Sequence, residues 1–156
     1  MARKFDVGAK APAFTLPRDG GGTVSLADFT GKKLVLFFYP RADTSGCTKE
    51  AIDFSRLKGA FGKANTEILG VSADPVAAQD KFKAKHKLSI ALGSDETRRM
   101  LEAYGVWQEK SMYGRKFMGI ARTTFLIGAD QRIARIWPKV SIDGHAEEVL
   151  AAAGAL

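Results

Sequence analysis

The stretch "KLVLFFYPRADTSGCTKE", residues 33–50, joins an apolar run to a segment with a helical pattern. Residues 33–39 are rich in aliphatic and aromatic side chains, which predicts a buried strand. A helix is expected after Thr44, because threonine is a residue type that caps helices. The apolar positions that follow are spaced so that they lie on one helical face: Cys47, Ala51, Phe54, Leu57 and Phe61. The sequence therefore predicts a strand that leads into a helix, with Cys47 near the helix start.

Strand and helix patterns alternate after this stretch, which is typical of an α/β protein. We expect further strands at residues 67–73 and 89–94. The helix between them should begin with Asp74 as its cap and Pro75 in its first turn, and run to about Leu88.

The last third of the chain departs from this alternation. A short helix at 96–104 should end at the glycine that follows it. Residues 105–119, rich in glycine and aromatic side chains, are interpreted as a loop. Strands at 121–128 and 132–140 should then form an antiparallel hairpin, and a final helix follows Asp143.

Together these elements predict a mixed sheet with helices on its faces, as in a thioredoxin-like fold. The glycine-rich "RDGGGT" at 18–23 lies between two short strand patterns and predicts an N-terminal β-hairpin extension. A phosphate-binding loop is the alternative, but no helix begins after these glycines, as such a loop requires. We expect residues 1–156 to form a single domain.

Composition and charge exclude several classes of protein. The 156 residues are 46% hydrophobic and 26% charged, as in an ordinary globular domain. The longest purely apolar run is residues 34–38, so we expect no membrane span and no export signal. The single Cys47 cannot form an internal disulfide, which favours a cytoplasmic setting.

A formal net charge of +7 would suit a nucleic-acid partner. The charges are dispersed, however, and the densest cluster, "KFKAKHK" at 81–87, has a helical period and is interpreted as a solvated helix face. We therefore expect no nucleic-acid partner. His86 and His145 have no metal-ligand spacing to Cys47 or to each other, so we also expect no metal and no cofactor.

Cys47 is the residue that carries chemistry. It would be the third residue of its helix, where unpaired backbone N–H groups and the helix dipole stabilise a negative charge on sulfur. A buried cysteine that packs as a small apolar side chain is the alternative. Ionisation alone gives a modest gain in rate, so donors to a reacting oxygen are also needed. The candidates are the Thr44 hydroxyl, the N–H groups of Gly46 and Cys47, and an arginine from elsewhere in the chain.

The segment "PRADTSGC" at 40–47 resembles the peroxiredoxin signature of proline, three residues, threonine, two residues and cysteine. The resemblance continues through "GCTKEAIDF" and, more distantly, "YGVWQEKSMYG" and "GIARTTFLIG". The opening "FTLPRDGGGTVSLADFTGKKLVLFFYP" is similar to the start of the peroxiredoxin Q branch, also called bacterioferritin comigratory protein. Nearly the whole chain is covered.

This resemblance implies that Cys47 is the peroxidatic cysteine, which attacks a hydroperoxide and becomes a sulfenic acid. It also implies that Thr44 and Arg122 hold the peroxide. Pro40 would shield the sulfur, and Glu50 would orient an arginine through a charge-assisted pair. Each has a simpler alternative: Pro40 ends the strand, Thr44 only caps the helix, Glu50 is a solvated carboxylate, and Arg122 forms a surface salt bridge.

Many members of this branch have a resolving cysteine five positions after the first, where this chain has Ile52. The resemblance therefore implies a one-cysteine peroxidase, a monomer or weak homodimer. Its reductant would be an external thiol such as thioredoxin, glutaredoxin or a small thiol. Two other functions are left open: a redox-silent basic binding module, and a thiol-disulfide reductase, which usually needs Cys-x-x-Cys.

Overall fold

A computed structural model describes residues 6–156. Its centre is a five-stranded sheet in the order β5-β4-β3-β8-β9. Parallel pairs join β3 to β4 and β4 to β5, whereas β8 pairs antiparallel with both β3 and β9. The strands are β3 (Lys33–Phe38), β4 (Thr66–Ser72), β5 (Ala91–Ser94), β8 (Thr123–Ile127) and β9 (Ile133–Trp137). The predicted mixed sheet and thioredoxin-like fold are confirmed.

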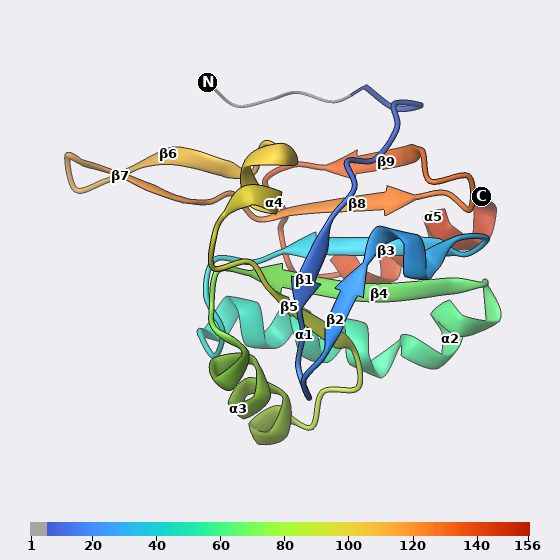
Figure 1. Cartoon of the computed structure of the whole chain (residues 1–156), viewed down its shortest axis with the longest axis horizontal. Helices are drawn as coiled ribbons and strands as arrows, with labels where there is room; N and C mark the ends of the chain where they lie inside the picture. The colour runs from blue at the N-terminus through green and yellow to red at the C-terminus, as the bar shows by residue number, and fades with distance from the viewer. Residues whose placement is uncertain (1–5) are drawn as a thin grey trace.

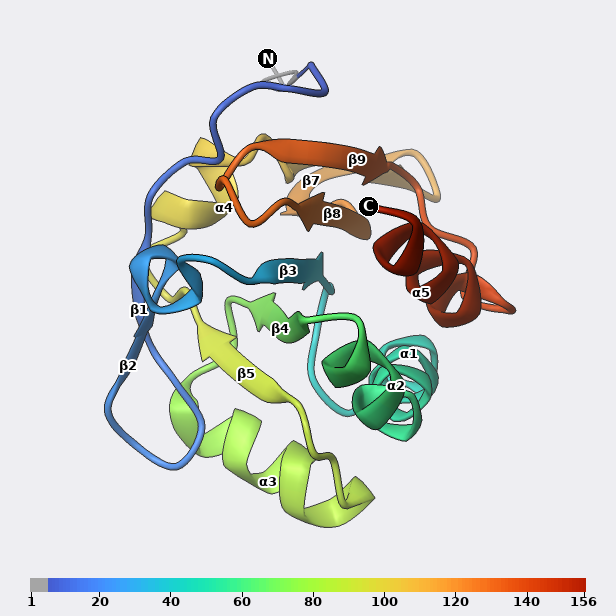
Figure 2. The ribbon, with the colours of Figure 1, turned by 90° about the vertical axis from the view of Figure 1, so that its right-hand side faces the viewer.

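Two hydrophobic cores lie on the two faces of this sheet, because successive side chains of a strand point to opposite faces. Leu34, Leu36 and Phe38 of β3 belong to one core, and Val35 and Phe37 belong to the other. The second core is covered by four helices. They are α1 (Ser45–Arg56), α2 (Lys58–Lys63), α3 (Val76–His86) and α5 (His145–Ala155). In Figure 2, α1, α2 and α5 lie side by side at the right and α3 lies below β5.

The first core is covered by the N-terminal segment and by α4 (Arg99–Ala103). This segment contains β1 (Thr15–Pro17), β2 (Thr23–Ser25) and a 3-10 helix, η1 (Leu26–Phe29). The first two strands pair antiparallel, which confirms the predicted hairpin at the glycine-rich turn. Among the described residues, no helix is long and apolar enough to cross a membrane.

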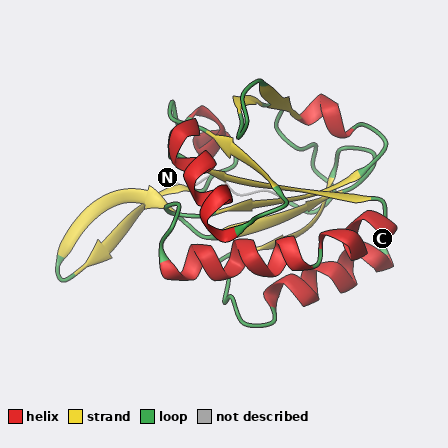
Figure 3. Cartoon of the chain, turned by 90° about the horizontal axis from the view of Figure 1, so that it is seen from below, coloured by secondary structure: helices red, strands yellow, loops and turns green. Residues whose placement is uncertain are grey.

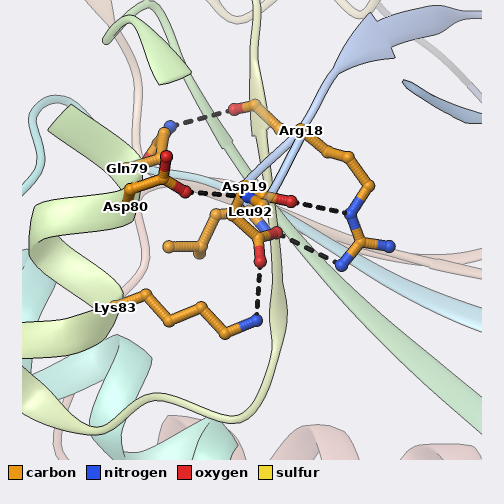
Figure 4. A network of polar contacts seen from close by, with 8 residues as sticks. Arg18, Asp19, Gln79, Asp80, Lys83 and Leu92 are labelled. Carbon is orange, nitrogen blue, oxygen red and sulfur yellow. Dashed lines mark hydrogen bonds and ion pairs between the residues drawn. The ribbon is translucent and has the colours of Figure 1, made fainter. Parts of the chain in front are cut away.

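Asp19 ties this hairpin to the body of the protein, as Figure 4 shows. Its carboxylate accepts hydrogen bonds from the Leu92 N–H at 2.8 Å and from Lys83 Nζ at 2.7 Å, and pairs with Arg18 at 3.3 Å. Burial alone would raise the pKa of Asp19, but these partners lower it below 3.8. The hairpin is therefore fixed to β5 and α3 by a buried, charge-assisted contact.

Two predicted elements were wrong at their ends. The helix after Thr44 stops at Arg56, and the shorter α2 follows it. The next helix has Pro75 as its cap rather than Asp74. The Asp74 carboxylate instead accepts the Ala42 N–H at 2.7 Å and the Ser72 hydroxyl at 2.6 Å. The side chain expected to cap α3 thus holds the loop in front of α1.

The prediction of a loop at residues 105–119 was also wrong. It is mostly a hairpin of β6 (Trp107–Met112) and β7 (Arg115–Ile120), which projects from the body of the protein in Figures 1 and 3. Tyr113 and Gly114 form its turn, both with positive φ, as a tight hairpin turn requires. Most of its residues are exposed on both faces, so the sequence has no apolar alternation that would reveal the strands.

Candidate active site

The candidate site forms at one end of the central sheet. The antiparallel register pairs Phe38, the last residue of β3, with Thr123, the first residue of β8. The loop after β3 and the residue before β8 therefore lie at the same end. That loop carries Pro40 and Thr44 and leads into α1, and the residue before β8 is Arg122. Figure 1 shows this end, with the base of the β6–β7 hairpin at the same side.

Cys47 is the third residue of α1, as the sequence predicts. The first hydrogen bond of the helix runs from the Thr48 N–H to the Thr44 carbonyl at 2.8 Å. Within residues 6–156, no acceptor pairs with the N–H groups of Gly46 and Cys47, which leaves both as donors at the helix start. Cys47 is 1% exposed, so its sulfur is largely shielded from water. Electrostatic interactions between the sulfur and nearby donors are therefore little screened.

Arg122 connects the thiol to Glu50. Its Nη2 donates to Cys47 Sγ at 3.2 Å, and its Nη1 donates to Glu50 Oε1 at 2.7 Å. The Arg122 side chain is 18% exposed and that of Glu50 is 1% exposed, so the pair is not a surface salt bridge. Burial alone would lower the pKa of Arg122, but Glu50 and Cys47 raise it, and the guanidinium stays charged.

Glu50 is buried in surroundings that disfavour its charged form. Burial is the main cause that raises its pKa to about 7, against the charge and hydrogen bond of Arg122, which lower it. Oε1 accepts from Arg122, whereas Oε2 has no hydrogen-bonding partner among residues 6–156. A buried carboxylate with one bonded oxygen fixes the orientation of the guanidinium at the expense of its own solvation.

Gly46 contributes in a way that the sequence did not reveal. A Cβ at this position would lie 3.1 Å from Ile142 Cδ1 and 3.4 Å from Arg122 Nη2. The absence of a side chain therefore lets the guanidinium reach the first turn of α1. No local sequence signal indicates this requirement, because Arg122 and Ile142 are remote from Gly46 in the chain.

Thr44 and Pro40 are both exposed, on the solvent side of the site. Thr44 occupies the cap position of α1, but its hydroxyl donates to the Arg41 carbonyl at 2.9 Å and makes no capping bond to the helix. With its hydrogen engaged, the hydroxyl oxygen can accept a hydrogen bond from a peroxide. The structure thus brings Cys47, Arg122 and Glu50 into contact, whereas Thr44 and Pro40 lie in the adjoining loop without a direct bond to the sulfur.

A thioredoxin-like sheet with one buried cysteine at a helix start, bonded to an arginine, defines a thiol-based oxidoreductase. The AhpC/TSA family model matches residues 7–136. The chain is similar to the putative peroxiredoxin bcp of Coxiella burnetii, with 48% identity over 94% of this chain and 97% of that protein. It is also similar to peroxiredoxin Bcp of Bacillus subtilis, with 42% identity over 94% and 93% of the two chains.

Solved structures give the same result. The structure of bacterioferritin comigratory protein from Xanthomonas campestris matches with a TM-score of 0.90 and 40% identity, and covers 96% of this chain and 98% of that one. A mutant PrxQ from Xylella fastidiosa matches with a TM-score of 0.93 and 37% identity, over 98% of both chains. The chain belongs to the AhpC/TSA family, in its Bcp or PrxQ branch of peroxiredoxins. It is a thiol-dependent peroxidase with a single cysteine.

Proposed function

We propose that Cys47 is the peroxidatic residue and that the contacts around it form the catalytic site. The single observation that carries this proposal is the hydrogen bond from Arg122 to Cys47 Sγ at the start of α1. The guanidinium donates to the sulfur, and two backbone N–H groups without helical partners lie at the same helix start. The same donors can stabilise the negative charge that develops on a departing peroxide oxygen.

The reaction follows from these groups. The thiolate of Cys47 attacks the terminal oxygen of a hydroperoxide, the S–O bond forms and the O–O bond breaks. The sulfur is oxidised to a sulfenic acid, and the peroxide is reduced to water or an alcohol once the leaving oxygen takes a proton. Arg122 and the N–H groups of Gly46 and Cys47 would hold the two oxygens, and Thr44 would accept the peroxide O–H. Glu50 is a positioning residue that acts through Arg122.

Both hydrogen peroxide and organic hydroperoxides are proposed as substrates. The similar protein from Xanthomonas campestris is described by its alkyl peroxide reduction activity. We infer the same class of substrate for this chain because its fold and its thiol environment are similar. Pro40, exposed at the entrance of the loop, would limit access of a second oxidant to the sulfenic acid.

An external thiol should complete the cycle, because the chain has no second cysteine. Thioredoxin, glutaredoxin and a small thiol are the candidates, and a reducing cytoplasm is the compartment that supplies them. We place the protein there as a monomer or weak homodimer, with no nucleic-acid partner.

The test is peroxide consumption by the wild type and by Cys47→Ser, each with and without a thiol donor. The wild type should turn over only with the donor. Without it, consumption should stop after about one peroxide per thiol, or about two where excess peroxide oxidises the sulfenic acid further to the sulfinic acid. The serine variant should be inactive in both conditions while keeping its fold by circular dichroism. Continuous turnover with peroxide alone, or activity in the serine variant, would refute the proposal.

A further inference from the structure

Lys110 is a basic residue of β6 that the proposed reaction does not use. It is partly buried, whereas its strand neighbours Glu109 and Ser111 are exposed. A Cβ on Gly119 would lie 3.2 Å from Lys110 Cδ and 3.5 Å from its Cε, so the lysine stem runs across Gly119. Gly119 pairs with Gln108, two residues nearer the base of the hairpin. The Lys110 side chain therefore leans towards the body of the protein and not towards the exposed tip.

The charged groups that act on Lys110 indicate that its ammonium group lies near the candidate active site. Partial burial is the first cause that lowers its pKa, and the Arg122 charge lowers it further, whereas Cys47 acts in the opposite direction. Both site residues are thus close enough to act on the ammonium group. In Figures 1 and 3 the hairpin base and the start of α1 lie at the same end of the molecule, in agreement with this placement.

Lys110 also lacks a neutralising partner. In the part of the chain that the structure describes, no carboxylate forms an ion pair with it, whereas Lys116 on the same hairpin pairs with Glu109 at 3.7 Å. At the site itself, Glu50 is engaged by Arg122. An anion that approaches the sulfur therefore meets a second positive charge that no acidic side chain offsets.

We propose that Lys110 is a specificity residue that favours oxidants carrying a negative charge, namely hydroperoxides with a carboxylate or similar acid group near the peroxide. This proposal rests on the proposed function of Cys47. A neutral peroxide gains little from the ammonium, whereas an anionic one is attracted to it during approach. The residue acts on selection between substrates and is not required for the chemical step.

Alkylation of the native thiol tests this without any peroxidase turnover. Iodoacetate and iodoacetamide react with the same thiolate, so the ratio of their rates cancels the degree of ionisation and isolates the effect of the reagent's charge. Lys110→Gln should lower the iodoacetate to iodoacetamide ratio by about threefold to tenfold at low salt, and 0.5 M salt should shrink the difference, as expected of about one screened charge. Lys110→Arg, which keeps the charge, should keep the ratio.

Arg115→Gln is the matched control, because it removes one positive charge from the exposed first residue of β7, at the tip of the same hairpin. It should change the ratio by less than about twofold. In Lys110→Gln, the rate of reduction should likewise fall for a carboxylate-bearing hydroperoxide and change little for a neutral alkyl hydroperoxide. An unchanged ratio in Lys110→Gln, an equal drop in Arg115→Gln, or a native thiol that neither reagent labels would overturn the proposal. If peroxide reduction is absent while the ratio still shifts, the proposed function fails. Lys110 then attracts anionic reagents to the thiol, but its role as a specificity residue for hydroperoxides fails with the function.

Discussion

Arg122 Nη2 lies 3.2 Å from Cys47 Sγ, although the two residues are 75 positions apart in the chain. The sheet register makes this contact possible, because Phe38 at the end of β3 pairs with Thr123 at the start of β8. The loop that leads to Cys47 and the residue Arg122 therefore lie at the same end of the sheet. The contact depends on the fork of the guanidinium, since one arm reaches the sulfur and the other reaches Glu50. A side chain with a single donor group cannot reproduce both bonds in this geometry.

Arg122→Lys should therefore lose most of the activity although it keeps the charge. We expect kcat/KM for hydrogen peroxide to fall by about 10²–10³, the usual effect of removing one preorganised donor to a developing negative charge. Stopped-flow oxidation of the thiol measures this directly. Arg56→Lys on the exposed side of α1, where the arginine pairs with Glu147, is the control and should be close to wild type. A decrease of less than about threefold in Arg122→Lys would leave Arg122 with a structural role only.

Glu50 should make the stability of the protein depend on pH. Its pKa rises from 4.5 in the unfolded chain to about 7 in the folded protein, so the folded state binds more protons between these values. The stabilising contribution is complete below 4.5 and is lost as the pH rises through 7. The loss is on the order of 3 kcal/mol.

Urea unfolding of the wild type and Glu50→Gln between pH 4.5 and 8 measures this effect. Relative to the variant, which does not titrate, the wild type should become less stable across that interval. The comparison of slopes is independent of any constant cost of placing an amide in the site. Parallel pH profiles for the two proteins would show that folding leaves the pKa of Glu50 unchanged, and would contradict this prediction.

Gly46→Ala should lower activity because the new Cβ meets Ile142 and the Arg122 guanidinium. Displacing the guanidinium by a few tenths of an ångström weakens its bond to sulfur, so we expect kcat/KM to fall by about tenfold. Gly59→Ala in α2 is a matched control, since nothing lies within 4 Å of a Cβ there. It should stabilise the protein by up to about 1 kcal/mol through helix propensity, with unchanged activity. Equal behaviour of the two variants in both assays would remove the special role of Gly46.

Asp19→Asn should destabilise the protein without affecting the thiol. The variant leaves Lys83 without its buried carboxylate, which costs about 1–3 kcal/mol near neutral pH. Because the pKa of Asp19 is lowered in the folded state, its contribution is present above 3.8 and is lost as the pH falls through the folded value. Asp80→Asn, at an exposed acceptor of the Gly20 N–H, should have a much smaller effect. Denaturation with urea at pH 7 and at pH 3 compares the two variants.

The strand-to-helix stretch around Cys47 could be predicted from sequence because its signals are local: an apolar run, a capping residue and a 3.6-residue period. The hairpin at Trp107–Ile120 could not, since exposure on both faces leaves no period to detect. Asp74 was misassigned because a carboxylate before a helix usually caps it, whereas here a tertiary contact to Ala42 takes precedence. The resemblance to peroxiredoxins predicted Arg122 and Glu50 as site residues. Their contact depends on the sheet register, which no local sequence pattern encodes.

Because Cys47 is the only thiol, we also expect the protein to be inactivated by overoxidation. Without an internal partner, the sulfenic acid of Cys47 persists until an external thiol arrives, and excess peroxide can oxidise it to the sulfinic acid. Mass spectrometry after graded peroxide doses should show sulfinic Cys47 in the absence of a thiol donor and little of it when the donor is present. A sulfur that stops at the sulfenic state under excess peroxide would contradict this expectation.

Ile52→Cys provides the complementary variant. Ile52 is 40% exposed on α1, so the substitution should be tolerated. Five residues of helix separate the two positions by about 7.5 Å along the axis, too far for a disulfide within an intact helix. A disulfide can therefore form only if the start of α1 unwinds after oxidation, which its uncapped first turn and Gly46 favour. We expect peroxide to produce this disulfide and to reduce the sulfinic fraction. If the variant is as sensitive as the wild type and forms no disulfide, α1 stays helical through the catalytic cycle and the thiol donor must reach the sulfur in the folded site.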